Sequence, residues 1–171
     1  MTYSRFEELP VWQEAIRLAE EIYDMTECKA WSGSRSLRDQ LERAALSVSN
    51  NIAEGFERGT TNELLSFIYI ARGSAGEVRS MLCFLERRPG FENLKFQISN
   101  LKSLAESCSR QLRGWADHLQ NSEIKGQRHL TDKSRAESDK KKRAAAFDVT
   151  LLRHLPAWHP KRKEAEEKGL I

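Results

Sequence analysis

Few side chains in this chain of 171 residues have the types and spacing that bond chemistry requires. Adjacent carboxylates such as Glu20 and Glu21 diverge by about 100° around a helix, so they do not form an acid–base pair. The histidines all lie at or beyond residue 118: His118, His129, His154 and His159. None has a glutamate or a second histidine at helical ligand spacing, so we predict no metal centre and no hydrolytic enzyme.

Glycines and cysteines give no sign of a bound cofactor. Gly73 and Gly76 neither follow a strand pattern nor precede the Gly-Lys-Ser/Thr ending of a phosphate-binding loop. The cysteines, Cys28, Cys83 and Cys108, are widely spaced in helical sequence, which is typical of reduced core or boundary residues. We therefore expect a protein that uses no cofactor and is not an enzyme.

Two short segments are more informative because they break helical propensity inside apolar repeats. Residues 50–55 include two asparagines and a glycine, which are poor helix formers. Gly55 would allow close approach of another helix, and the asparagine amides would bond across the helices or cap neighbouring backbone. In the alternative interpretation, Asn51 and Glu54 line a subunit contact or a polar channel.

The second segment, residues 72–77, places two glycines, a serine and an alanine between strongly apolar turns. Small residues let a facing backbone approach, so we predict close packing here. Arg72 or Glu77 could then pair with a group of the preceding helix such as Glu54 or Arg43. The residues predicted to fix helix register or subunit contacts are Asn51, Glu54, Arg72 and Glu77.

Four segments with apolar residues at helical spacing would carry these side chains. They cover residues 10–28, residues 37–58, the stretch from Thr60 to the Arg88-Pro89-Gly90 stop, and residues 92–119. Ser36 is an eligible N-cap for the second, and Thr60 with Glu63 predicts a capping box at the third. The apolar repeat of the first consists of Trp12, Ile16, Ala19, Ile22 and Tyr23.

Connections of only a few residues make sequential helices antiparallel. Because no alternating strand pattern competes, the sequence predicts an all-α protein. We expect an antiparallel up-down-up-down four-helix bundle over residues 1–120 and a basic C-terminal extension over residues 121–171. No apolar core of a signal peptide opens the chain and no run of 18 apolar residues occurs, so we expect a cytoplasmic protein without membrane contact.

Positive charge is concentrated in the extension. Residues 1–120 carry a formal net charge of −2, whereas residues 121–171 carry +5. The predicted contacts for nucleic-acid phosphates are Lys140, Lys141, Lys142 and Arg143. No aromatic residue is interleaved with this run, which argues against sequence-specific readout. A short amphipathic segment near 144–158 follows, which Pro156 would end, and it could dock on its own bundle, a neighbouring subunit or another partner.

Two strings in the bundle resemble the 23S rRNA-intervening-sequence proteins: LRDQLERAALSVSNNIAEG at 37–55 and FIYIARGSAGE at 67–77. The stretch FEELPVWQEA at 6–15 also looks like the start of that family's first helix. The likeness spans the whole predicted bundle. Typical members end near the close of the fourth helix, so the resemblance implies nothing about residues 121–171.

The resemblance implies a bacterial four-helix bundle that assembles as a ring-shaped homopentamer. Our leading hypothesis is a non-enzymatic, homo-oligomeric scaffold or adaptor associated with RNA or a ribonucleoprotein. The alternative follows from a related branch, the accessory variability determinant of diversity-generating retroelements, and is an accessory subunit that binds a reverse transcriptase and nucleic acid. A nuclease is the weakest hypothesis, because no metal cluster or positioned acid and base is apparent.

Overall fold

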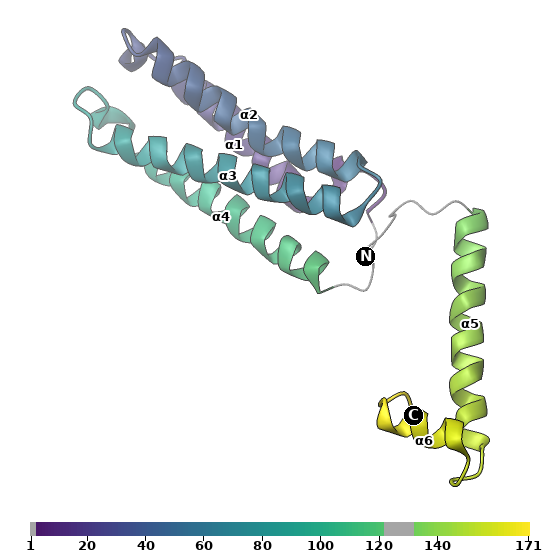
Figure 1. Ribbon diagram of the computed structural model, residues 1–171. Helices are drawn as coiled ribbons and strands as arrows, with labels where there is room; N and C mark the ends of the chain where they lie inside the picture. Colours follow the sequence, from purple (N-terminus) through teal and green to yellow (C-terminus); the bar gives the residue numbers. More distant parts are fainter. Residues whose placement is uncertain (1–2, 122–131) are drawn as a thin grey trace. The chain divides into compact units, whose positions relative to one another are not determined.

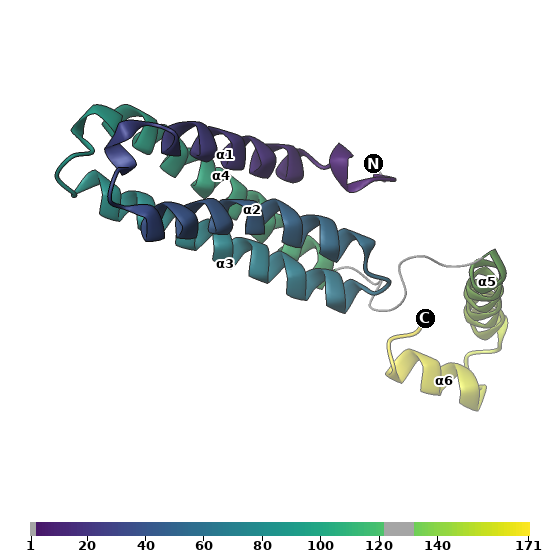
Figure 2. The same cartoon turned by 90° about the horizontal axis from the view of Figure 1, so that it is seen from above.

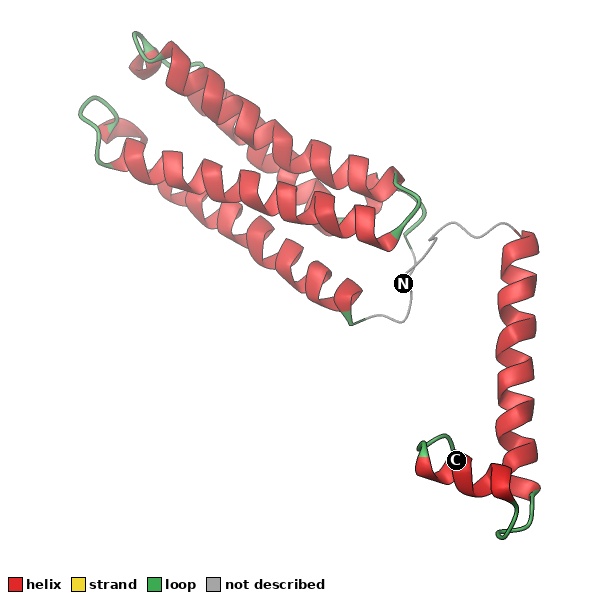
Figure 3. Ribbon diagram, in the orientation of Figure 1, coloured by secondary structure: helices red, strands yellow, loops and turns green. Residues whose placement is uncertain are grey.

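The computed structural model describes residues 3–121 and 132–171, and for residues 132–139, 141 and 142 the backbone alone. Every regular element in these two ranges is a helix (Figure 3). This confirms the predicted all-α class. The chain divides into two compact units, residues 1–128 and residues 129–171, and each is described by itself.

Four long helices lie side by side in the first unit (Figures 1 and 2). They are α1 (Pro10–Thr26), α2 (Arg35–Glu57), α3 (Thr61–Glu86) and α4 (Lys95–Gln120). α1 packs against α2 and α4, and α3 packs against the same two helices. Single turns of 3-10 helix occur at Phe6–Glu8, Lys29–Trp31 and Glu92–Leu94. The contacts therefore form a closed cycle of four helices around one interior.

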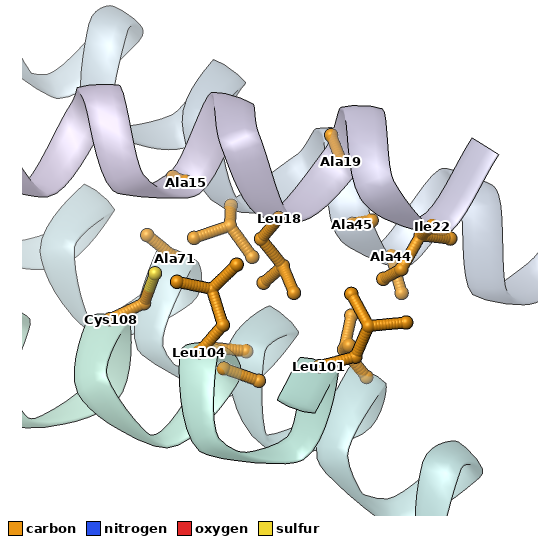
Figure 4. Packing of buried hydrophobic residues seen from close by; sticks show 14 of the residues in the cluster. Ala15, Leu18, Ala19, Ile22, Ala44, Ala45, Ala71, Leu101, Leu104 and Cys108 are labelled. Atoms are coloured by element: carbon orange, nitrogen blue, oxygen red, sulfur yellow. The ribbon is translucent and has the colours of Figure 1, made fainter. Parts of the chain in front are cut away.

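A single apolar core fills this interior. Leu18 and Ile22 of α1 point into the same space as Leu101 and Leu104 of α4 (Figure 4). Each such leucine or isoleucine stabilises the fold by roughly 1.5–3 kcal/mol when it is fully withdrawn from water. The alanines between them, which let the helices approach closely, are Ala15, Ala19, Ala44, Ala45 and Ala71.

The buried face of α1 differs in part from the predicted repeat. Ala19 and Ile22 are buried as expected, but Tyr23 is 38% exposed, so its assignment to the apolar stripe was wrong. Successive helical residues diverge by about 100°, which carries Tyr23 away from the core when Ile22 points into it. Trp12 lies partly buried at the edge of the core, where its ring packs edge-on against Phe6 at 5.2 Å between centroids.

The helix ends show which capping signals are used. Thr60 is the N-cap of α3, as predicted: its Oγ1 accepts the Glu63 N–H at 3.2 Å and donates to the Glu63 carboxylate at 2.7 Å. The prediction of Ser36 as the N-cap of α2 was wrong, because that helix already begins at Arg35 after the N-cap Ser34. Gly33, with φ of 85°, makes the turn that lets the helix begin earlier.

Replacing Thr60 by alanine should destabilise the protein by about 1 kcal/mol, because the Glu63 N–H loses its acceptor at the start of α3. Thr60→Ser keeps the hydroxyl and should retain most of that stability. Chemical denaturation of the two variants beside the parent protein measures the difference. Equal unfolding free energies for the alanine and serine variants would show that the cap contributes nothing.

Two connections of the first unit meet through a pair of buried aromatic residues. Trp31, between α1 and α2, packs edge-to-face on Phe91, between α3 and α4, at 5.1 Å between ring centroids. The Trp31 Nε1–H donates to the carbonyl of Met25 at 3.1 Å, so its one polar group is satisfied. We call Trp31 and Phe91 the aromatic clasp.

The second unit contains α5 (Asp132–His154) and α6 (Pro160–Glu167). α5 ends two residues before Pro156, as the sequence predicted. The Arg162 guanidinium donates to the carbonyl oxygens of Arg153 and Leu155 at 3.2 and 2.7 Å, which satisfies two acceptors near the end of α5. Because α5 begins at Asp132, it is longer than the short amphipathic segment predicted near 144–158. Residues 122–131 of the predicted extension lie outside the described residues.

Candidate functional site

A chain of hydrogen bonds that begins at Asn51 joins α2 to α3 through Ser47 and Ser74. The Asn51 Nδ2–H donates to the carbonyl and to Oγ of Ser47, at 2.7 and 2.9 Å. The hydroxyl of Ser47 lies 2.9 Å from that of Ser74, which in turn donates to the Ile70 carbonyl at 3.1 Å. Bonds in such a chain polarise one another, so in this hydroxyl relay (Asn51, Ser47 and Ser74) the Asn51 amide supports the Ser47–Ser74 bond that crosses from α2 to α3.

The other three predicted contact residues do not make the specific pairings that the sequence suggested. Glu54 is exposed and pairs within its own helix end, with Arg58 at 2.5 Å. Glu77 does pair with α2, but it accepts a hydrogen bond from Gln40 at 3.1 Å. Arg72 is partly buried and has no hydrogen bond or ion pair with any described residue. The prediction that Arg72 or Glu77 pairs with a group of the preceding helix is therefore confirmed for Glu77, but its partner is Gln40 and neither Glu54 nor Arg43.

Gly55 lies where α2 and α3 approach most closely among the glycines of the described chain. A Cβ at this position would lie 2.6 Å from Cβ of Phe67 and 3.3 Å from Cδ1 of Leu64. Contacts below 3.0 Å to a side-chain root can be relieved only by moving the helix. The absence of a side chain is thus required by the helix spacing, as the sequence predicted.

The glycines of α3 serve no such purpose inside the chain, and the prediction that they admit a facing helix of the same bundle was wrong. A Cβ at Gly73 or at Gly76 would meet nothing within 4 Å, and both residues are exposed. Of this segment, Ser74 and Ala75 are the residues that point inward and are buried. The geometry of the helix determines which of these residues are buried, because four consecutive residues point in four different directions and cannot all face the same neighbour.

Gly73 belongs to a longer strip of α3, and Gly76 lies at one edge of this strip, four residues before Ser80. Its members follow one another at steps of three and four residues, and we call them the α3 outer face: Ser66, Ile70, Gly73, Glu77, Ser80 and Phe84. Ile70 and Phe84 are each 50% exposed. Such steps are those of a helix seam that packs against another helix. The strip therefore combines a site of very small residues, around Gly73, with apolar side chains that are exposed to water, Ile70 and Phe84.

The predicted phosphate contacts lie on α5. Lys140 and Arg143 are exposed, and neither pairs with a carboxylate in the part of the chain that the structure describes. The side chains of Lys141 and Lys142 lie outside the described residues. Cations that are exposed and unpaired are available to phosphate oxygens.

The first unit contains the stretch of the chain that matches a known protein family. A family model described as 23S rRNA-intervening sequence protein matches residues 7–114. The chain belongs to the 23S rRNA-intervening sequence protein family. A comparison with curated proteins finds no match. In this family member the matched stretch includes the hydroxyl relay, Gly55 and the α3 outer face, whereas the basic residues of α5 lie beyond it.

One buried polar link of this family member was missed by sequence reasoning. Thr26 at the end of α1 is fully buried, and its Oγ1 contacts the Glu42 carboxylate of α2 at 2.5 Å. Arg38 donates to the same carboxylate at 2.7 Å, and this bond raises the pKa of the guanidinium. The i, i+4 spacing of Arg38 and Glu42 was the available signal, but nothing in sequence marks Thr26 as their partner.

The described residues show little that could drive bond chemistry. No group of three or more His, Cys, Asp or Glu side chains suited to a metal ion occurs among them. Burial raises the pKa of the Cys108 thiol to about 12, so this cysteine stays protonated and inert at neutral pH. Within the same described ranges, no helix combines the length and hydropathy that crossing a bilayer demands.

Proposed function

We propose that this family member is a homo-oligomeric scaffold or adaptor that associates with RNA or a ribonucleoprotein and carries out no bond chemistry. Its subunit is an antiparallel up-down-up-down bundle of α1–α4, which the short connections and the closed cycle of helix contacts support. Five copies is the number that the family resemblance implies. The α3 outer face is the observation that carries the proposal.

Glycine inside an exposed helix destabilises it by about 1 kcal/mol relative to alanine, so two in α3 are a sizeable loss for a lone subunit. No close helix packing within the chain compensates for this loss at Gly73 or Gly76, because an added Cβ at either position would meet nothing within 4 Å. Ile70 and Phe84 meanwhile leave half of their surfaces in water. Close packing of this face against a helix of another copy accounts for both features, since small residues admit a backbone and apolar neighbours gain burial.

The polar residues between α2 and α3 hold the α3 outer face in place on the bundle. The hydroxyl relay and the Gln40–Glu77 bond tie α3 to α2, and the Gly55 contact sets their spacing. The outer face is therefore held at a fixed position on the bundle. A rigid surface loses less entropy on association than a mobile one, which favours a defined assembly.

The RNA part of the proposal rests on charge. Residues 121–171 carry +5, and Lys140 and Arg143 are exposed on α5. An oligomer repeats this basic segment once per subunit, so several weak phosphate contacts act together. A cytoplasmic location fits such a partner and stays a prediction. The reverse-transcriptase accessory hypothesis also stays a prediction, and no feature of the described residues favours it over a scaffold.

Binding of single-stranded RNA should depend on salt through the run 140–143. Because each neutralised phosphate contributes a slope of about −0.7 in log K against log salt, replacing all four cations by glutamine should reduce the slope by up to about 3. Fluorescence anisotropy over a range of salt concentrations measures it. The matched control replaces four exposed cations of the first unit: Arg17, Arg35, Arg110 and Arg113.

An equal loss of slope in the control would mean that binding follows net charge alone and not this run. No retention of RNA by the parent protein at low salt would remove the RNA association itself. Cleavage of RNA that persists through repurification, and is abolished by a substitution in the bundle, would overturn the non-enzymatic part of the proposal.

A further inference from the structure

The second unit places an aromatic side chain on the helical face that carries part of the basic run. Residues 140–163 contain eight Lys or Arg and one Asp, a net charge of +7. The run 140–143 has no aromatic neighbour in sequence, yet one helical face of α5 carries Lys140, Phe147 and Leu151 at i, i+7 and i+11, with Arg143 beside them. We call these four residues the basic–aromatic face.

This face is open to solvent within its unit. Phe147 is 65% exposed and Leu151 is 53% exposed, although most phenylalanines and leucines are covered in folded proteins. Trp158, in the connection from α5 to α6, is 73% exposed, and its ring lies 6.1 Å from that of His159 between centroids. Two large rings and two cations, neither of which pairs with a carboxylate among the described side chains, thus lie exposed within one small unit.

We propose that the basic–aromatic face binds single-stranded nucleic acid, with phosphates at Lys140 and Arg143 and unpaired bases stacked on Phe147 and on Trp158. This inference rests on the proposed RNA association and names the form of RNA that is bound. Proteins that hold single strands without sequence preference combine these two elements, a cationic track for the backbone and aromatic rings for the bases.

A duplex can contact the cations of this surface but not its rings. Its bases are stacked inside the helix, so it offers phosphates to Lys140 and Arg143 but no free base plane to Phe147 or Trp158. A single strand offers both along its length. The order of these groups along the chain matches such a ligand, because Lys140 and Arg143 come first, Phe147 follows one to two turns later on the same face of α5, and Trp158 follows in the connection to α6.

An anionic lipid surface fits less well. A helix that lies in a bilayer interface places its apolar residues on one face and its cations on the opposite one. On α5, Lys140 shares a face with Phe147 and Leu151, and the exposed Asp148 lies three and four residues before Leu151 and Leu152. Burying these leucines in acyl chains would take the carboxylate with them, which is unfavourable.

The test compares three ligands on the full chain at about 0.1 M salt: a labelled 20-nucleotide oligouridylate, an RNA duplex of the same length, and vesicles that contain phosphatidylserine. Phe147→Ala and Trp158→Ala should each weaken single-strand binding by about 5- to 150-fold, the range expected for loss of one stacked base. Duplex affinity should stay within about twofold of the parent. Phe147→Tyr and Trp158→Phe, which keep a ring, should restore most of the affinity.

Phe96→Ala is the matched control, because Phe96 is 78% exposed on α4 in the first unit and its removal should leave affinity unchanged. Unchanged single-strand affinity in both alanine variants would overturn the inference while leaving an RNA association through phosphates intact. Equal losses for single strand and duplex would overturn it as well. Preferential binding to vesicles would replace the nucleic acid by a membrane, and binding to none of the three would remove the proposed association too.

Discussion

Replacing Gly73 and Gly76 together by lysine is expected to convert the proposed oligomer into monomers without unfolding the subunit. Neither new side chain meets an atom of its own chain within 4 Å of Cβ, and lysine is a better helix former than glycine. Across a subunit contact, however, two long charged side chains would hold the facing helix away and would bury charge. Native mass spectrometry of the parent and the variant, with circular dichroism as the check on folding, measures the effect.

Gly114→Lys is the control for this experiment, since Gly114 is also an exposed helical glycine without neighbours but lies on α4. It should leave the mass of the assembly unchanged. A chain ending at residue 121 should also keep the parent stoichiometry, which would assign assembly to α1–α4. A parent protein that is monomeric would overturn the scaffold proposal, and a double variant that stays fully assembled would exclude the α3 outer face as the contact.

Gly55→Ala is expected to destabilise the subunit, in contrast to the usual gain from alanine in a helix. The new Cβ would lie 2.6 Å from Cβ of Phe67, so α2 and α3 must separate. Overpacking of a core typically costs about 1–3 kcal/mol, and the better helix propensity of alanine returns up to about 1 kcal/mol. We expect a net loss of about 1–2 kcal/mol, measured by denaturant unfolding at one fixed protein concentration.

Gly114→Ala again provides the comparison, because the same substitution at an unhindered position should stabilise the protein by up to about 1 kcal/mol. The two variants differ only in what the added methyl group touches. If Gly55→Ala were as stable as Gly114→Ala, the close approach of α2 and α3 would not be a constraint on this fold.

Local signals in the sequence predicted the helices well. Thr60 and Glu63 are three residues apart, and the bonds between them depend on nothing outside that turn. Pro156 likewise acts on the residues next to it. The start of α2 was missed by two residues, because Gly33 at positive φ, and not the hydroxyl of Ser36, determines where the helix begins.

Which way a helical residue points was predicted less well, and this limited the candidate site. Gly55 and Gly73 look alike in sequence, yet an added Cβ would meet Phe67 at Gly55 and nothing within 4 Å at Gly73. The difference depends on how α2 and α3 are rotated about their axes. The hydroxyl relay combines residues 27 positions apart, and the partner of Glu77 proved to be Gln40, so the pairing of these groups required the packed structure.

The aromatic clasp restricts how copies of this chain can join. The connection between α2 and α3 is short, so it could in principle act as a hinge about which the α1–α2 hairpin swings away and exchanges with the same hairpin of another copy. Such domain swapping would first have to pull Trp31 from Phe91, and would expose two buried rings to water. Closed subunits that meet through their surfaces are therefore the favoured building blocks of an assembly.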